Sequence, residues 1–396
     1  MNKQKYLIMG ITFLILIAIT PFVFSKLMNA KLNKMVENLN KEGYSVKLIK
    51  DKSSYLKTDK VFLVDIPGDK LNNQLVDNLK FKIETTFNNL PVTKVDFKGV
   101  LEKIDLTAKE YNDEINSLFD KKIKFTAVTP NFKVYDYKLE DINLPVGNAE
   151  VNIKGIKGIF EYSDIKNNKL SIDDISFITD NLLIEMKNIR NNSFYKKNNI
   201  KNENSFDFYL KVANNNIQIN NVKISTNSLI DKKTSVISKI SFDKFISNFL
   251  NMDNFMFNIN VLNLDTPALI AVANEIDPQK RDLLTLNLLK KGLEINLQSQ
   301  AEKIEVMNKS LGFYLVDANL KVLPDPNLQE DIKTNNLKFL DSTIHYESTP
   351  EIATLFMNLF PKSAFLFALA KKTNGKVILD ISLKNSKLLI NGEEVK

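Results

Sequence analysis

Few residues in this chain are suited to acid–base or nucleophilic chemistry. Its 396 residues include one histidine, His345, and no cysteine. Without Cys there is no thiol nucleophile, thiolate metal site or disulfide framework, and a lone His cannot build a multi-histidine metal site. Period-two alternation places His345 on the same strand face as Asp341 and Glu347. A Ser-His-Asp hydrolase also needs a nucleophile elbow such as G-x-S-x-G, which the sequence lacks. We therefore interpret His345 as a solvated histidine on a strand.

The carboxylates do not form a recognisable catalytic pair. Asp173-Asp174 and Glu393-Glu394 are adjacent in sequence, so in a strand the two members of each pair point to opposite faces. Glycoside hydrolysis needs two carboxylates facing one cleft about 5–10 Å apart. The sequence also lacks an EF-hand loop and the glycine spacings that cradle phosphates. We predict a protein that is not an enzyme, with no cofactor and no metal.

The basic balance of the chain is a weak indicator of its partners. Lys and Arg number 54 against 47 Asp and Glu, for a net charge of +7. Along most segments the positive residues alternate with acidic ones, whereas nucleic-acid binding requires clustered Lys/Arg with stacking aromatic residues. We therefore predict no nucleic-acid partner and a mild attraction to anionic lipid headgroups.

An uncharged apolar segment runs from Tyr6 to Phe24. As a helix it spans about 28 Å, close to the thickness of a hydrocarbon core. A cleaved signal peptide, a retained signal anchor and a buried core helix are the alternatives. The segment is longer than a usual signal h-region, and Val23-Phe24-Ser25 is a poor cleavage site, which favours a retained anchor. The anchor prediction includes Tyr6, Leu14, Ile17 and Phe24.

The orientation of this anchor does not follow from its flanking charges. Lys3 and Lys5 precede the segment, and Lys26, Lys31 and Lys34 follow it, so the positive-inside rule does not choose a side. The rest of the chain should lie on one side of the membrane. Directly after the anchor, apolar residues at near-helical spacing up to the capping Gly43 predict a short stalk or packing helix.

From Tyr44 onward the main pattern is the period-two alternation of half-buried strands. The clearest runs are Phe206, Phe208, Leu210 and Val212; Phe255, Phe257, Ile259 and Val261; and Val377, Leu379, Ile381 and Leu383. Short polar turns join most strands, which indicates an antiparallel meander.

A few helices interrupt this pattern in the second half of the chain. Thr266-Pro267 predicts an N-cap followed by Pro at the first helical position, Pro278 begins the next helix, and Thr349-Pro350 repeats the arrangement. The polar stretch from Arg190 to Ser205 is interpreted as an exposed hairpin loop or a subdomain joint.

These patterns predict a mainly β (α+β) fold: an N-terminal transmembrane helix, then an elongated antiparallel β-rich body with short helices in its C-terminal half. The predicted divisions are an anchor (1–25), a stalk helix (26–43), an N-terminal β-rich subdomain (44–195) and a C-terminal β-rich subdomain (196–396) with helices near 266–291 and 350–371.

Apolar strand faces are the feature most open to a functional interpretation. The chain has 26 Phe and no Trp. Either the Phe-bearing faces close on one another as a β core, or a long curved sheet keeps a partly open apolar trough that holds acyl chains. Burying one Phe stabilises by roughly 1.5–3 kcal/mol in both cases, so this quantity does not distinguish them. The predicted ligand-binding residues, in an apolar groove, are Phe206, Phe208, Phe255 and Phe257.

The apolar segment from Ile352 to Ala370 allows a similar choice. It is interrupted by Pro361 and Lys362 and fits a core helix pair that plugs one end of the sheet. It also fits a helix at a membrane interface or at the mouth of a groove, but such a helix should carry a more basic polar face. The shortage of basic residues on its polar face favours the interpretation as a core helix pair.

Three short segments resemble the YdgA-like family of bacterial envelope proteins, a domain of unknown function. They are the helix entry NLDTPALIAVANEI (Asn263 to Ile276), the helix–Gly–strand element LLKKGLEINLQ (Leu288 to Gln298) and the terminal LLINGEEV (Leu388 to Val395). The resemblance implies an inner-membrane anchor with the body in the periplasm, and it implies no catalytic residue.

The leading hypothesis is a non-enzymatic, single-pass protein of the bacterial inner membrane whose periplasmic body binds a lipid or another apolar ligand along its sheet faces. The alternative is a structural or protein-interaction module of the envelope without a small ligand. The expected partners are the inner membrane and a lipid or another envelope protein.

Overall fold

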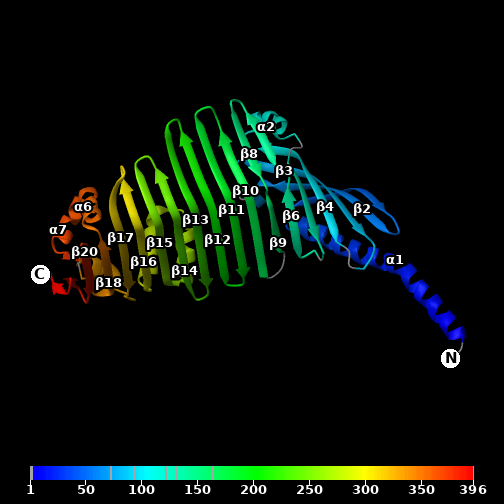
Figure 1. Ribbon diagram of the computed structural model, residues 1–396. Helices are drawn as coiled ribbons and strands as arrows, with labels where there is room; N and C mark the ends of the chain where they lie inside the picture. Colours follow the sequence, from blue (N-terminus) through cyan, green and yellow to red (C-terminus); the bar gives the residue numbers. More distant parts are fainter. Residues whose placement is uncertain are drawn as a thin grey trace. The chain divides into compact units, whose positions relative to one another are not determined.

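The chain forms two compact units, Met1–Asp180 (unit 1) and Asn181–Lys396 (unit 2). The computed structural model describes residues 3–71, 74–91, 94–120, 123–130, 132–161, 165–334 and 336–395, with side chains from residue 19 onward except that of residue 165 (Figure 1). The boundary between the two units, after Asp180, differs from the one predicted at 195/196. That position ends strand β11 (Leu182–Lys196), which pairs along its length with β12 (Asn199–Val212) inside unit 2.

Unit 1 contains an antiparallel sheet in which most strands pair with their sequence neighbours. β6 pairs with β9, β9 and β8 both pair with β10, and β7 pairs with β8. The strands are β1 (Ser45–Ser53), β2 (Lys57–Pro67), β3 (Val76–Asn88), β4 (Val95–Leu106), β5 (Lys124–Thr129), β6 (Val134–Leu139), β7 (Ile142–Val146), β8 (Ala149–Lys154), β9 (Lys157–Glu161) and β10 (Ile165–Ile178).

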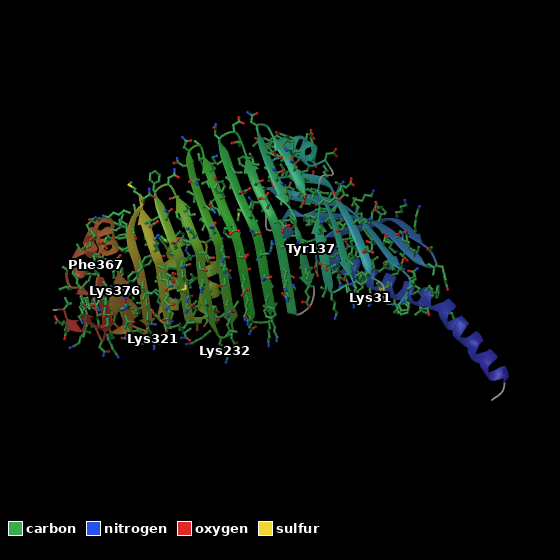
Figure 2. The ribbon with its side chains drawn as sticks, viewed as in Figure 1. Lys31, Tyr137, Lys232, Lys321, Phe367 and Lys376 are labelled. Carbon is green, nitrogen blue, oxygen red and sulfur yellow. The ribbon has the colours of Figure 1, made fainter. Side chains whose placement is uncertain are left out.

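Two glycines in this sheet make room for aromatic rings that lie across it. A Cβ atom on Gly99 would meet the ring of Phe125 at 2.0 Å, and one on Gly158 would meet the hydroxyl oxygen of Tyr137 at 2.6 Å. Tyr137 is labelled in Figure 2. Burial raises the pKa of the Tyr137 phenol. Each ring therefore covers a strand position without a side chain of its own, as aromatic residues commonly do beside strand glycines.

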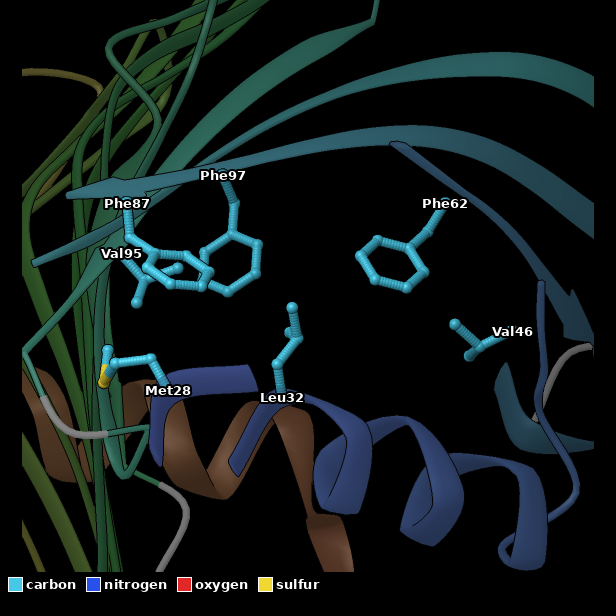
Figure 3. Packing of buried hydrophobic residues seen from close by; sticks show 7 residues of the cluster. All are labelled: Met28, Leu32, Val46, Phe62, Phe87, Val95 and Phe97. Carbon is cyan, nitrogen blue, oxygen red and sulfur yellow. The ribbon is translucent and has the colours of Figure 1, made fainter. Parts of the chain in front are cut away.

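Helix α1 (Lys3–Lys41) covers part of one face of this sheet. It continues without interruption through the predicted division at 25/26. Met28 and Leu32 contact a cluster that includes Phe62, Phe87 and Phe97 (Figure 3). Leu32 is completely buried. The predicted stalk segment is thus a packing helix, and Gly43, with φ of 95°, follows its C-terminal end.

A second helix, α2 (Asn112–Phe119), is joined to strand β4 of unit 1 by hydrogen bonds between its side chains and the strand backbone. The Asn116 side chain accepts from the Ile104 amide at 2.8 Å and donates to the Ile104 carbonyl at 2.7 Å. The short 3-10 helices η1 (Gly68–Leu71) and η2 (Lys109–Tyr111) complete the unit.

Unit 2 contains an antiparallel meander of long strands, from β11 to β18 in sequence order, followed by β20, β21 and β22, with β19 also paired to β20. The mainly β, antiparallel prediction is confirmed. The remaining strands are β13 (Asn215–Ile230), β14 (Lys233–Ser247), β15 (Leu250–Asp265), β16 (Leu293–Val306), β17 (Lys309–Val322), β18 (Leu340–Ser348), β19 (Lys371–Thr373), β20 (Lys376–Lys384), β21 (Lys387–Ile390) and β22 (Glu393–Glu394).

The helices of unit 2 lie in the two predicted regions and in one connection between strands. They are α3 (Thr266–Asn274), α4 (Pro278–Leu289), α5 (Leu328–Lys333), η3 (Leu337–Phe339), α6 (Pro350–Leu359), η4 (Pro361–Ser363) and α7 (Ala364–Ala368). The N-cap of α3 is Asp265 and not Thr266, because the Asp265 carboxylate accepts from the Ala268 amide at 3.0 Å. Asp277 caps α4 in the same way.

The segment from Ile352 to Ala370 packs on the sheet through only part of its apolar surface. Ile352 is 1% exposed, and Phe356 contacts Tyr314 and Tyr346 in edge-to-face geometry. Leu359 and Phe360, from the same predicted stripe, are 63% and 58% exposed. The core-helix interpretation holds for the first turns of α6 but not for its C-terminal end.

The predicted loop or joint from Arg190 to Ser205 is instead a pair of hydrogen-bonded strands, the distal halves of β11 and β12. Its polarity has a different cause. The Asn191 amide donates to the side-chain oxygens of Asn202 at 2.9 Å and Asn204 at 2.6 Å, and Ser193 donates to Asn191 at 3.0 Å. Cross-strand hydrogen bonds between side chains thus replace apolar contacts on this part of the sheet.

Candidate functional site

The four phenylalanines predicted to bind a ligand lie on one face of the unit 2 sheet, which we call the apolar face. Phe206 lies opposite Val222, and Phe257 lies opposite Ile240, which in turn lies opposite Ile224. Residues directly opposite in an antiparallel pair share a face, as do residues two apart in one strand. Strands β13 and β14 therefore separate the two Phe pairs and contribute their own apolar side chains between them.

The rings of neighbouring strands touch on this face. Phe242 on β14 stacks on Phe255 on β15 with ring centroids 4.8 Å apart, and Phe242 lies 6.3 Å from Phe245. Phe245 faces Ile219, which faces Phe208. The structure thus joins the two predicted pairs through Phe242 and Phe245, which the sequence reasoning did not select.

Three backbone irregularities lie in a line across strands β11, β13 and β15 of this sheet. Asn188, Asn221 and Asn254 have φ of 54°, 53° and 52°, the left-handed region that Asn tolerates better than most residues. The pairing register shifts beside Asn188 and Asn221, and the run of paired residues is interrupted at Asn254. An extra residue in a strand shifts its alternation by one position. Met252 and Phe255, three positions apart, consequently both face the apolar side.

Carboxylates on the neighbouring strands hold these asparagines. The Asn188 amide donates to Asp207 at 2.8 Å, and the backbone amide of Asn221 donates to the other oxygen of Asp207 at 2.7 Å. The Asn221 side chain donates to Asp243 at 2.8 Å. The bulges are therefore fixed by specific hydrogen bonds across three strand pairs.

A pattern in the sequence marks this line, although it was not among the features predicted above. The three asparagines follow one another at equal intervals along the chain, and each lies between two apolar residues three positions apart. The flanking pairs are Met186 and Ile189, Ile219 and Val222, and Met252 and Phe255.

The helices of unit 2 cover the apolar face only toward β15 to β21. Helices α3 to α5 pack around Leu264, Leu293 and Val322, while α6 and α7 pack around Ala301, Ile304 and Tyr346. On β12 to β14 the apolar side chains are mostly half-buried, and Ile240 is 40% exposed. A closed core made by unit 2 itself is therefore absent over these strands, within the residues that the structure describes.

His345 lies on the opposite, polar face of the sheet. Its Nδ1 atom is 2.7 Å from a carboxylate oxygen of Asp380 on β20, and its Nε2 atom is 4.0 Å from Glu347. The side chain is 40% exposed, and Lys376 pairs with Glu347 at 2.6 Å. Spacing along β18 predicted the neighbour Glu347, whereas Asp380 comes from strand pairing. Across the described ranges of the chain, no cluster of three or more His, Asp or Glu could hold a metal ion.

The predicted anchor residues lie largely beyond what the structure describes. The backbone of α1 passes through them, but the side chains of Tyr6, Leu14 and Ile17 lie outside the described residues, and Phe24 is half-buried. Within the described portion of the chain, no helix combines the length and apolarity needed to cross a membrane.

Comparison of the chain with protein-family models, with curated proteins and with solved structures finds no match.

Proposed function

We propose that this protein is a non-enzymatic, membrane-anchored protein of the bacterial envelope that binds a lipid or another apolar ligand on the apolar face of unit 2. One observation carries the proposal. The apolar face continues from β12 to β15 through paired apolar residues and the stacked rings of Phe242 and Phe255, while the helices of unit 2 cover only its far part.

The energetics of such a surface favour an occupant. Contiguous exposed apolar patches are uncommon on soluble proteins and usually mark an interaction site. Covering a half-exposed Phe or Ile side chain recovers part of the roughly 1.5–3 kcal/mol of full burial. Several such residues in adjacent rows match an elongated hydrocarbon chain better than a compact polar molecule.

The proposed location in the cell rests on the sequence. The uncharged run from Tyr6 to Phe24 supports a single-pass anchor, and the resemblance to the YdgA-like family supports an inner-membrane anchor with a periplasmic body. Reporter fusions at Lys396 test this topology. A reporter active in the periplasm is expected, and one active only in the cytoplasm would overturn the assignment.

Mass spectrometry of lipids that copurify with the full chain tests ligand binding. We expect bound lipid in the wild type and less of it in Phe255→Asp, which places a charge beside Phe242 on the apolar face. Ser241→Asp adds the same charge to the polar face of neighbouring β14 and should retain the lipid. Unchanged lipid in a folded Phe255→Asp protein would contradict the proposal.

A structural or protein-interaction module is the second candidate, and a separate observation favours it. Leu359, Phe360, Phe365 and Leu369 are all more than half exposed on α6, α7 and the adjoining residues. A photoreactive residue in place of Phe365 should crosslink to one reproducible envelope protein in cells. Crosslinks to no protein would count against this candidate.

A further inference from the structure

Unit 1 contains a separate cavity beneath the last turns of α1. Its outer chamber has a volume of about 790 Å³ and opens between α1 and the strands β6 and β9. Its apolar wall consists of Met35 and Leu39 from the helix and Phe132, Tyr135 and Phe160 from the sheet side. The Tyr135 ring lies 6.1 Å from Phe97 and 6.5 Å from Phe160, so the wall is a connected aromatic surface.

A smaller inner chamber continues this surface under the helix. Its volume is about 200 Å³, and it shares Met35, Leu39 and Tyr135 with the outer chamber. The remaining wall is apolar except for Thr85, and it includes Phe62 and Phe125. The inner chamber therefore offers almost no hydrogen-bond partner to a polar group and suits a hydrocarbon chain.

The rim of the outer chamber is charged. Lys31 and Lys34, both exposed and one helical turn apart, lie on the α1 side, and Lys133 lies on the other. Among the described residues that line the chamber, Glu42 is the one acidic residue. A positive rim above an apolar interior complements a molecule with an anionic head and a hydrocarbon tail.

We propose that this cavity binds an anionic amphiphile. The carboxylate or phosphate of the ligand pairs with Lys31 and Lys34, and its chain lies along Met35, Leu39 and Tyr135 toward the inner chamber. The site belongs to unit 1 alone and goes beyond the proposed function, because it uses no residue of the apolar face of unit 2.

Native mass spectrometry of the full chain in amphipol tests the site with oleic acid and oleyl alcohol, two probes with the same tail. Oleate should bind about tenfold more tightly, because two lysines near a charged head contribute on the order of this factor. The double variant Lys31→Glu/Lys34→Glu should remove this preference while leaving the affinity for the alcohol unchanged. Equal affinity of the wild type for both probes would overturn the proposal.

Two further variants separate the cavity from general charge and folding effects. Lys47→Glu/Lys50→Glu changes the net charge equally on exposed residues of β1 and should keep the preference for oleate. Asn38→Trp places a large ring in the outer chamber from an exposed helix position and should lower the affinity for both probes. Full binding by a folded Asn38→Trp protein would contradict the assignment.

Parallel titrations with phosphatidylglycerol and phosphatidylcholine distinguish the source of the head. Tighter binding of phosphatidylglycerol than of oleate would identify a phospholipid, and the reverse a free fatty acid. Phe255→Asp serves as the independent marker for unit 2. This variant should leave oleate binding in unit 1 unchanged. The binding proposals for unit 1 and unit 2 can therefore be refuted independently of each other.

Discussion

The two units solve the same packing problem in different ways. Each has an antiparallel sheet whose apolar face is partly covered by helices, but α1 packs on the Phe-bearing strands of unit 1, whereas the helices of unit 2 leave β12 to β14 uncovered. Phe62, Phe87 and Phe97 are consequently less than 10% exposed, whereas Phe206 and Phe257 of unit 2 remain half-buried. Strand alternation alone thus does not determine whether an apolar face is buried as a protein core or left partly exposed. The presence of a covering element decides it.

The largest expected difference between the units comes from truncating one apolar residue in each. Leu32→Ala removes a fully buried side chain and should lower the free energy of unfolding by about 2–5 kcal/mol. Phe257→Ala, on the half-buried face, should cost about 1 kcal/mol despite its larger side chain. Urea unfolding with hydrogen exchange resolved by peptide measures both. Leu27→Ala, at a half-exposed position of α1, is the control, and equal losses in both units would refute the contrast.

A buried polar residue of unit 1 should give the next largest effect. Asn89 is fully buried, accepts from the Thr58 hydroxyl at 3.0 Å and donates to the Ser54 carbonyl at 2.8 Å. Asn89→Ala leaves these groups without a partner and should cost about 2–3 kcal/mol. The exposed neighbour Asn88→Ala provides the comparison for the same unfolding measurement, and a loss no greater than its own would contradict the prediction.

In unit 2, a substitution at a bulge should lower the free energy of unfolding more than truncation of any single apolar residue on the strands that no helix covers. Asn221→Val places a β-branched residue at φ of 53° and should cost about 1–2 kcal/mol, in addition to the lost hydrogen bond with Asp243. Asn221→Gly accepts this φ and should recover most of the backbone term. Thermal unfolding of both variants measures the difference. If valine and glycine destabilise equally, the left-handed backbone is not the cause.

The smallest expected effect is a change in how the stability of unit 1 depends on pH. A hydrogen bond from the buried Lys60 lowers the pKa of Asp51, and the Ser53 hydroxyl adds to the shift. A lowered folded-state pKa contributes stability that is present above the unfolded pKa and is lost as the pH falls through the folded value. Since the Asp51 side chain is 40% exposed, this contribution is below about 1 kcal/mol.

Melting temperatures of the wild type and Asp51→Asn should therefore differ at neutral pH and converge below the normal pKa of an aspartate. The exposed Lys303–Glu305 pair of unit 2 is the matched case. Lys303→Met should change the melting temperature less than Asp51→Asn does. A gap for Asp51→Asn that persists in strong acid would assign its effect to packing.

Local patterns predicted the strands well because each signal lies within a few residues. The alternation of Phe255, Phe257 and Ile259 identified both strand β15 and the face that these residues share. Pro267 and Pro278 correctly marked the beginnings of α3 and α4, although the capping side chain of α3 comes from Asp265.

Features that depend on pairing between strands were not predictable in the same way. The polar run from Arg190 to Ser205 gave no indication of a strand, because its asparagines satisfy one another across a hairpin. Likewise, the cavity of unit 1 needs α1 to fold back on β6 and β9, which lie far away in sequence. Phe242 and Phe245 join the Phe rows only through the register set by the bulges.

The equal intervals between Asn188, Asn221 and Asn254 also bear on how this sheet arose and how its size changes. Each interval contains one complete hairpin that contacts mainly its neighbours, as the units of a solenoid do. Duplicating or deleting one such hairpin preserves the register, the bulge and the orientation of every apolar side chain. Adding or removing such a hairpin would therefore change the length of the apolar face in steps of one whole hairpin.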